Sequence, residues 1–110
     1  REARDGDGGR QRLRSGVRGL APPQTADWAR LALGGAVRGR DMVEAGAEAA
    51  AALRAAGADL VVGLCHTGIG VEAGPPGMEN AGLALARAAG IDALVLGHTH
   101  RVFPGPGWEE

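Results

Sequence analysis

Residues 54–66 read RAAGADLVVGLCH, and residues 87–98 repeat the pattern as RAAGIDALVLGH. Each copy contains the end of an apolar helix, a glycine that can stop the helix, an aspartate, a short apolar run and a histidine. The apolar runs at 60–64 and 93–96 are continuous rather than alternating, which is typical of strands buried on both faces of a sheet. The repeat therefore predicts two buried strands, each followed by a histidine.

A helix is expected before each of these strands. Asp41, three residues before a glutamate, has the spacing of a capping box and begins the first helix. A second helix is expected over residues 79–89. Residues 13–20 predict a further strand, although Ser15 and Arg18 interrupt its apolar pattern. The order strand, helix, strand, helix, strand predicts an α/β fold with a parallel βαβαβ sheet.

Length and composition limit what the chain can be. Its 110 residues suffice for one small domain, and a net charge of −1 gives no reason to expect binding to a nucleic-acid polymer. No apolar run reaches the ~20 residues that a membrane span requires. The Arg-rich stretch at 1–12 is expected to be a solvated loop. Because the chain begins without Met and ends on two glutamates, we expect 1–110 to be a segment truncated at both ends.

The three histidines are the candidate functional residues. Parallel strands end at one edge of their sheet, so His66 and His98 should lie within roughly 5–8 Å of each other, close enough to share a metal ion. In extended backbone, His98 and His100 would point the same way. Neutral imidazoles bind zinc and similar divalent metals. Cys65 should point to the opposite face from His66 and belong to the core.

Other polar residues have a structural interpretation beside a functional one. Asp59 and Asp92 stand at the starts of the strands, far from the histidines, and are expected to be turn or cap residues. Asn80 is expected to cap the second helix, with a substrate contact as the alternative. Arg101 could pair with a phosphate or lie on the surface. Thr67 is expected to serve as a turn residue.

Two motifs resemble the last two motifs of the calcineurin-like metallophosphoesterases: CHTG at 65–68 and GHTH at 97–100. Three further blocks resemble a branch of that superfamily, the bacterial 2′,3′-cyclic-nucleotide 2′-phosphodiesterases/3′-nucleotidases. These blocks are GLAPPQ at 19–24, MENA at 78–81 and VFPG at 102–105. Taken together, these blocks resemble the C-terminal half of such a catalytic domain.

The resemblance extends over residues 13–107 and implies part of a four-layer α/β/β/α sandwich. It also implies two divalent metal ions (Mn, Zn, Co or Fe), with His66 and His98 as ligands of one ion and His100 as a ligand of the other. The implied parent protein hydrolyses 2′,3′-cyclic nucleotides and 3′-nucleotides, using a metal-activated hydroxide. The 5′-nucleotidase relatives have Gln in place of His100.

Several parts of such an enzyme are expected outside this chain. The resemblance places the catalytic His and the remaining metal ligands upstream of Arg1, and a nucleoside-binding domain downstream. It also implies a periplasmic or cell-surface location for the parent. The chain alone is expected to lack useful activity and to expose the apolar sheet face intended for the missing half.

Three alternatives stay open at this point. One is a non-catalytic module that binds metal or phosphate, and another is a parent with 5′-nucleotidase-type activity. The third is a mononuclear zinc hydratase that uses His66, His98 and His100 as its three ligands. No carboxylate that could orient these histidines is evident nearby in the sequence.

Overall fold

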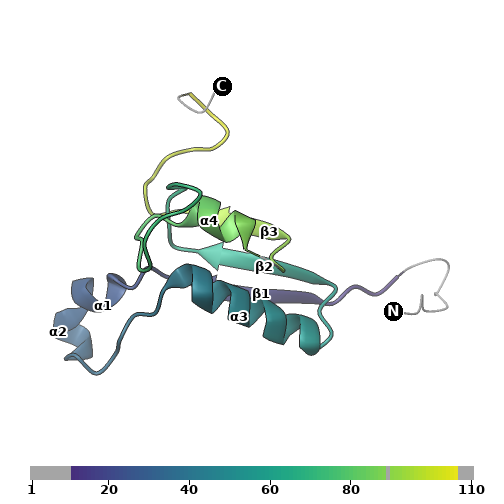
Figure 1. The fold of residues 1–110 in the computed structure, drawn as a ribbon, viewed down its shortest axis with the longest axis horizontal. Coiled ribbons are helices and arrows are strands. Elements are labelled where there is room, and N and C mark those ends of the chain that lie inside the picture. The colour runs from purple at the N-terminus through teal and green to yellow at the C-terminus, as the bar shows by residue number, and fades with distance from the viewer. Residues whose placement is uncertain (1–10, 89, 107–110) are drawn as a thin grey trace.

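The sheet is parallel and three-stranded, as the sequence predicts. A computed structural model describes residues 11–88 and 90–106, so most of the expected loop at 1–12 lies outside the described residues. The strands are β1 (Ser15–Leu20), β2 (Leu60–Cys65) and β3 (Ala93–Leu96), in the order β1-β2-β3 (Figure 1). Both pairs of neighbours are parallel, so the predicted α/β fold is confirmed.

Two helices connect the strands. Helix α3 (Met42–Ala55) joins β1 to β2, and its N-cap is Asp41, whose carboxylate accepts a hydrogen bond from the Glu44 N–H at 2.9 Å. Helix α4 (Gly82–Arg87) joins β2 to β3 and is shorter than the predicted helix at 79–89. Within the described ranges, none of the helices combines the length and the hydrophobicity that a membrane span requires.

Helix α4 begins late because a side chain binds the backbone that precedes it. The Thr67 hydroxyl donates to the Glu79 carbonyl oxygen and accepts a hydrogen bond from the Ala81 N–H, both at 2.8 Å. Backbone groups bonded in this way are satisfied without a helical turn. Residues 79–81 are therefore a loop fastened to the end of β2.

Two one-turn helices were not predicted. They are α1 (Thr25–Trp28) and α2 (Arg30–Leu33), and both lie between β1 and α3. Four residues are too few to show a helical repeat of apolar positions, so the sequence carries no periodic signal for them. Gly34, with φ of 58°, ends α2 in the left-handed region.

The core lies between one face of the sheet and helices α3 and α4. Its fully buried large side chains include Met42, Val61 and Leu85. Cys65 is also buried there, as predicted, and burial raises the pKa of its thiol. Its neighbour His66 is exposed, which confirms that adjacent residues at the end of β2 point to different sides.

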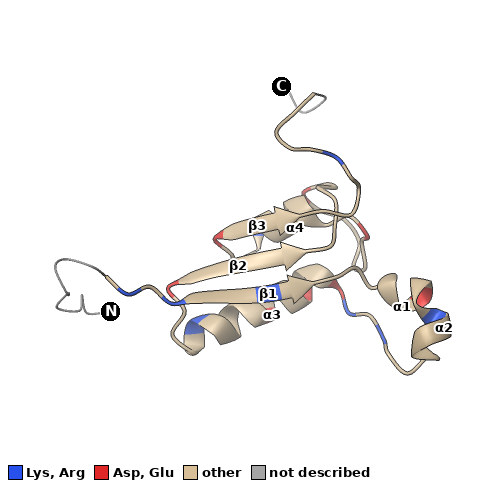
Figure 2. Cartoon of the chain, turned by 180° about the vertical axis from the view of Figure 1, so that it is seen from behind, with Lys and Arg blue, Asp and Glu red and all other residues tan. Residues whose placement is uncertain are grey.

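The other face of the sheet is bare, as expected for the chain alone, so the continuous apolar runs at 60–64 and 93–96 are covered on one face only. Helices α3 and α4 lie on the same side (Figure 1), and in the view from behind the ribbons of the three strands contain almost no charged residues (Figure 2). Val17, Leu64 and Val95 are about half exposed on it, at 54%, 48% and 58%. Strand β1 forms in spite of Ser15 and Arg18 because it is an edge strand, where both residues are exposed.

The strand starts are held by the aspartates of the repeat. Asp59 accepts a hydrogen bond from the Arg14 N–H at 2.9 Å, and Asp92 accepts one from the Val61 N–H at 2.8 Å. Arg54, at the end of α3, forms an ion pair with Asp92. The predicted structural role of both aspartates is confirmed.

Candidate metal site

His66 and His98 follow β2 and β3 and meet at the carboxyl edge of the sheet. Nδ1 of His98 lies 3.1 Å from Nε2 of His66, and the ring centroids are 4.7 Å apart with an interplanar angle of 58°. The prediction that the two imidazoles lie side by side is confirmed, and they are slightly closer than expected. The parallel pairing of β2 with β3 produces this proximity, because it brings both strand ends to one place.

The distance between the two nitrogens fits joint ligation of one ion. With metal–nitrogen bonds of about 2.0–2.1 Å, two neighbouring ligands have their nitrogens roughly 2.9–3.4 Å apart, depending on the angle at the metal. The observed 3.1 Å lies in this range. Among the residues that the structure describes, however, no group of three or more His, Cys, Asp or Glu could hold a metal ion by itself. The two imidazoles therefore have the spacing of neighbouring ligands, but they do not make up a complete metal site within the described residues.

The backbone at the His-x-His motif differs from the expectation. His98 and His100 have φ of 74° and 57°, which is the left-handed region rather than extended backbone. The argument that both side chains point the same way is therefore wrong. Non-glycine residues in this region cost about 1–3 kcal/mol each and are concentrated at functional sites. His100 does not complete a three-ligand group with the other two histidines, so the mononuclear three-histidine alternative gains no support.

A carboxylate that was not predicted from the sequence lies beside His98. Oε1 of Glu79 is 2.6 Å from Nε2 of His98. Trp28 stacks on the same imidazole, with centroids 5.4 Å apart and planes 20° apart. Neither residue is near His98 in the sequence, and the placement of Glu79 depends on the loop that Thr67 fastens. No local pattern could have revealed this contact.

The loop after β2 is held by close contacts rather than by a helix cap. Asn80 accepts a hydrogen bond from the Gly68 N–H at 3.0 Å, whereas the N-cap of α4 is Ala81. The prediction that Asn80 caps this helix is therefore wrong. Gly70 has φ of 66°, and a Cβ atom there would lie 1.9 Å from the Asn80 carbonyl oxygen. Only glycine fits that position.

The two candidate substrate residues line one pocket. Asn80 and Arg101 border a pocket of about 450 Å³ together with Ile69, Gly70 and Thr99. Arg101 is exposed there. The structure thus brings together two residues that are 21 positions apart, on the loops that follow β2 and β3.

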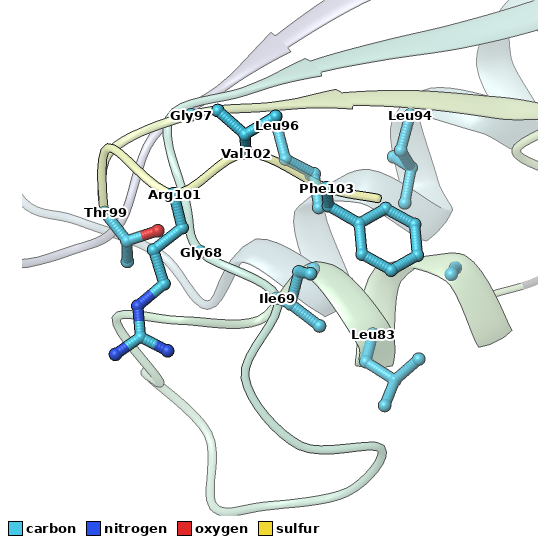
Figure 3. Close-up of a pocket in the computed structure, with 12 residues that line it drawn as sticks. Gly68, Ile69, Leu83, Leu94, Leu96, Gly97, Thr99, Arg101, Val102 and Phe103 are labelled. Atoms are coloured by element: carbon cyan, nitrogen blue, oxygen red, sulfur yellow. The ribbon is translucent and has the colours of Figure 1, made fainter. Parts of the chain in front are cut away.

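A second pocket, of about 560 Å³, lies on the α4 side of β3 and is mainly apolar. Figure 3 shows Leu83, Leu94 and Phe103 around it, with the guanidinium of Arg101 directed away from Phe103. None of the three histidines lines this pocket. Its lining suits an apolar group rather than a metal ion.

Comparison with known proteins shows that this chain is similar to phosphoesterases. No family model matches the chain. The trifunctional nucleotide phosphoesterase protein YfkN of Bacillus subtilis is 41% identical over 101 residues, which is 91% of this chain and 7% of that protein. The 2′,3′-cyclic-nucleotide 2′-phosphodiesterase/3′-nucleotidase of Haemophilus influenzae is 39% identical over 100 residues, 91% of this chain and 15% of that protein. The corresponding protein of Salmonella typhimurium is 37% identical over 101 residues, 92% of this chain and 16% of that protein.

The fold agrees with the sequence comparison. The crystal structure of the calcineurin-like phosphoesterase YfkN from Bacillus subtilis superimposes with a TM-score of 0.84 and 36% identity. The match covers 97% of this chain and 33% of that one. The chain spans only 7–16% of the curated relatives described above. In both sequence and fold, the chain is similar to one segment of the calcineurin-like nucleotide phosphoesterases.

Proposed function

We propose that this chain forms one side of a two-metal phosphoesterase site in a larger protein that hydrolyses 2′,3′-cyclic nucleotides and 3′-nucleotides. His66 and His98 ligate one divalent ion, and His100 ligates the other. The observation that carries the proposal is the 3.1 Å separation of the His66 and His98 ring nitrogens at the sheet edge. The names of the nucleotide phosphoesterase relatives support the class of substrate.

The reaction would need the two metal ions, residues of this chain and residues of the upstream half of the parent protein. When bound, the two ions would activate a water molecule for attack on phosphorus and hold the phosphate oxygens. His66 and His98 contribute neutral imidazole lone pairs. Arg101 can pair with phosphate oxygens through two N–H groups, and Asn80 borders the same pocket. The general acid and the carboxylate ligands belong to the upstream half, and export of the parent to the periplasm or cell surface is part of the proposal.

The test compares two neighbouring side chains in the parent protein. His98→Ala should remove one of two bound ions, because it deletes a ligand of the shared site. Cys65→Ala should leave both ions bound, since the Cys65 side chain lies in the core with Met42 and Leu85. Elemental analysis of the purified variants measures the metal content directly.

Activity on nucleotides separates the proposal from its alternatives. Hydrolysis of 2′,3′-cyclic AMP that falls with metal content supports it, whereas preferential hydrolysis of 5′-AMP would indicate 5′-nucleotidase-type activity. Metal binding without turnover of either substrate would indicate a non-catalytic module. Equal metal loss in the Cys65→Ala and His98→Ala variants would contradict the assignment of ligands.

A further inference from the structure

We propose that Glu79 is a positioning residue for the metal site. Its carboxylate holds the proton of His98 on Nε2 and thereby directs the unprotonated Nδ1 toward the ion shared with His66. This inference rests on the proposed function, and it adds a residue that acts on a ligand without being one.

The two nitrogens of the His98 ring contact two different groups. Nε2 lies 2.6 Å from Oε1 of Glu79, and Nδ1 lies 3.1 Å from Nε2 of His66. A carboxylate accepts hydrogen bonds and has none to donate, so the hydrogen of this contact belongs to Nε2. A neutral imidazole with its proton on Nε2 has its lone pair on Nδ1, the nitrogen that faces His66. A carboxylate paired with the distal nitrogen of a metal-binding His fixes its tautomer and raises its basicity.

The position of Glu79 is itself fixed by the fold. Its carbonyl oxygen accepts a hydrogen bond from the hydroxyl of Thr67, a residue with 0% exposure. The adjacent residue Asn80 is bonded to the Gly68 N–H on the loop after β2. The backbone of Glu79 is therefore anchored to the strand end that carries His66, and its side chain reaches across to His98 after the neighbouring strand.

The His98 ring is held from a second direction. Trp28 of α1 stacks on it at 5.4 Å with nearly parallel planes, so the ring face and the ring edge are both in contact. The His98 side chain is only 19% exposed, compared with 43% for Glu79. Two such contacts restrict rotation of the ring, and a ligand that is already oriented loses less conformational freedom when it binds an ion.

The geometry argues against Glu79 as a direct ligand. It lies at the opposite nitrogen of His98 from His66. Glu79, His66 and His98 also do not form a metal-holding group, since the described part of the chain contains no such group of three. The carboxylate therefore acts through the imidazole.

The experiment measures metal affinity in the Co²⁺-loaded parent protein, by competition with a chelator and by visible absorption. Glu79→Ala should weaken binding of one ion about 10–100-fold and leave the other unchanged. Glu79→Gln keeps the size of the side chain and the backbone contact to Thr67 but loses the charge. Its loss of metal affinity should therefore be smaller than that of Glu79→Ala. In both variants the Co²⁺ absorption of the affected ion should change, which a purely structural role would not produce.

Glu72→Gln is the matched control. Glu72 lies in the same loop and forms an ion pair with Arg87, so its replacement should leave both ions and both absorption spectra unchanged. Unaltered affinity in both Glu79 variants, with one ion lost in His98→Ala, would overturn this inference and leave the proposed function standing. If Glu79→Gln loses as much metal affinity as His98→Ala, Glu79 is a ligand. That result would also overturn this inference. If His98→Ala loses no ion, the proposed function fails and this inference fails with it.

Discussion

At the scale of single residues, Thr67 connects the fold to the site. Among the described residues it is the one polar residue that is buried as a whole, and both its donor and its acceptor capacity are used. Through these bonds it sets where α4 begins and where Glu79 stands. Thr67 was predicted to be a turn residue, and in the structure it also holds the loop against the end of β2.

Thr67→Val should destabilise the chain by about 1–3 kcal/mol, because a buried N–H of Ala81 loses its partner. Thr25→Val is the matched control, since the Thr25 hydroxyl is buried without a hydrogen-bond partner among the described residues. That substitution should be neutral or slightly stabilising. Urea unfolding of both variants at low protein concentration measures their free energies of unfolding. Equal losses of stability in the two variants would contradict the role given to Thr67.

At the scale of elements, the carboxylate of Asp41 joins α3 to the loop before α4. One oxygen accepts a hydrogen bond from the Glu44 N–H at the start of α3, and the other accepts one from the Gly77 N–H at 2.7 Å. These bonds, the one from Gly77 first, lower the pKa of Asp41. The predicted cap is confirmed. The contact with Gly77 was not predicted, because no sequence pattern near Asp41 indicates it.

Asp41→Ala should cost about 0.5–2 kcal/mol at neutral pH through loss of the cap. Because the folded-state pKa is lowered, the ionised carboxylate contributes its full stability above the unfolded pKa of about 3.9. That contribution disappears as the pH falls through the lower folded-state pKa. Urea unfolding at pH 7 and at pH 2 should therefore show a smaller difference between wild type and variant at the lower pH.

Glu48→Ala on the exposed side of α3 is the control for that measurement. Glu48 pairs with Arg40 at the surface, where ion pairs contribute little, so its replacement should change the stability only slightly. A stability difference between Asp41→Ala and wild type that grows toward low pH would contradict a lowered folded-state pKa of Asp41.

At the scale of the whole molecule, the sheet is half covered. Helices α3 and α4 pack on one face, and the opposite face presents partly exposed apolar side chains from all three strands. The chain also matches only a third of the similar solved structure. In the sandwich that the resemblance implies, a second sheet would pack on this face, and in the isolated chain the face is in water.

Replacing Val17, Leu64 and Val95 together by Thr should make the isolated chain more monomeric, because Thr keeps the strand propensity and reduces the apolar area in water. Sedimentation at several protein concentrations measures the association. Val61→Thr, which places a hydroxyl on the buried face, is the contrasting control and should destabilise the fold instead. A wild-type chain that stays monomeric at high concentration would contradict the prediction.

The sequence by itself determined the parallel βαβαβ order, the cap at Asp41, the burial of Cys65 and the proximity of His66 and His98. These features follow from local signals, namely a repeat, a capping spacing and apolar runs, together with the rule that parallel strands end at one edge. Only the tertiary structure decided the rest. The contact of Glu79 with His98 depends on the path of a loop that is fastened by a side chain from another strand end. The left-handed backbone at His98 likewise depends on how distant segments pack, which residue patterns along the chain do not encode.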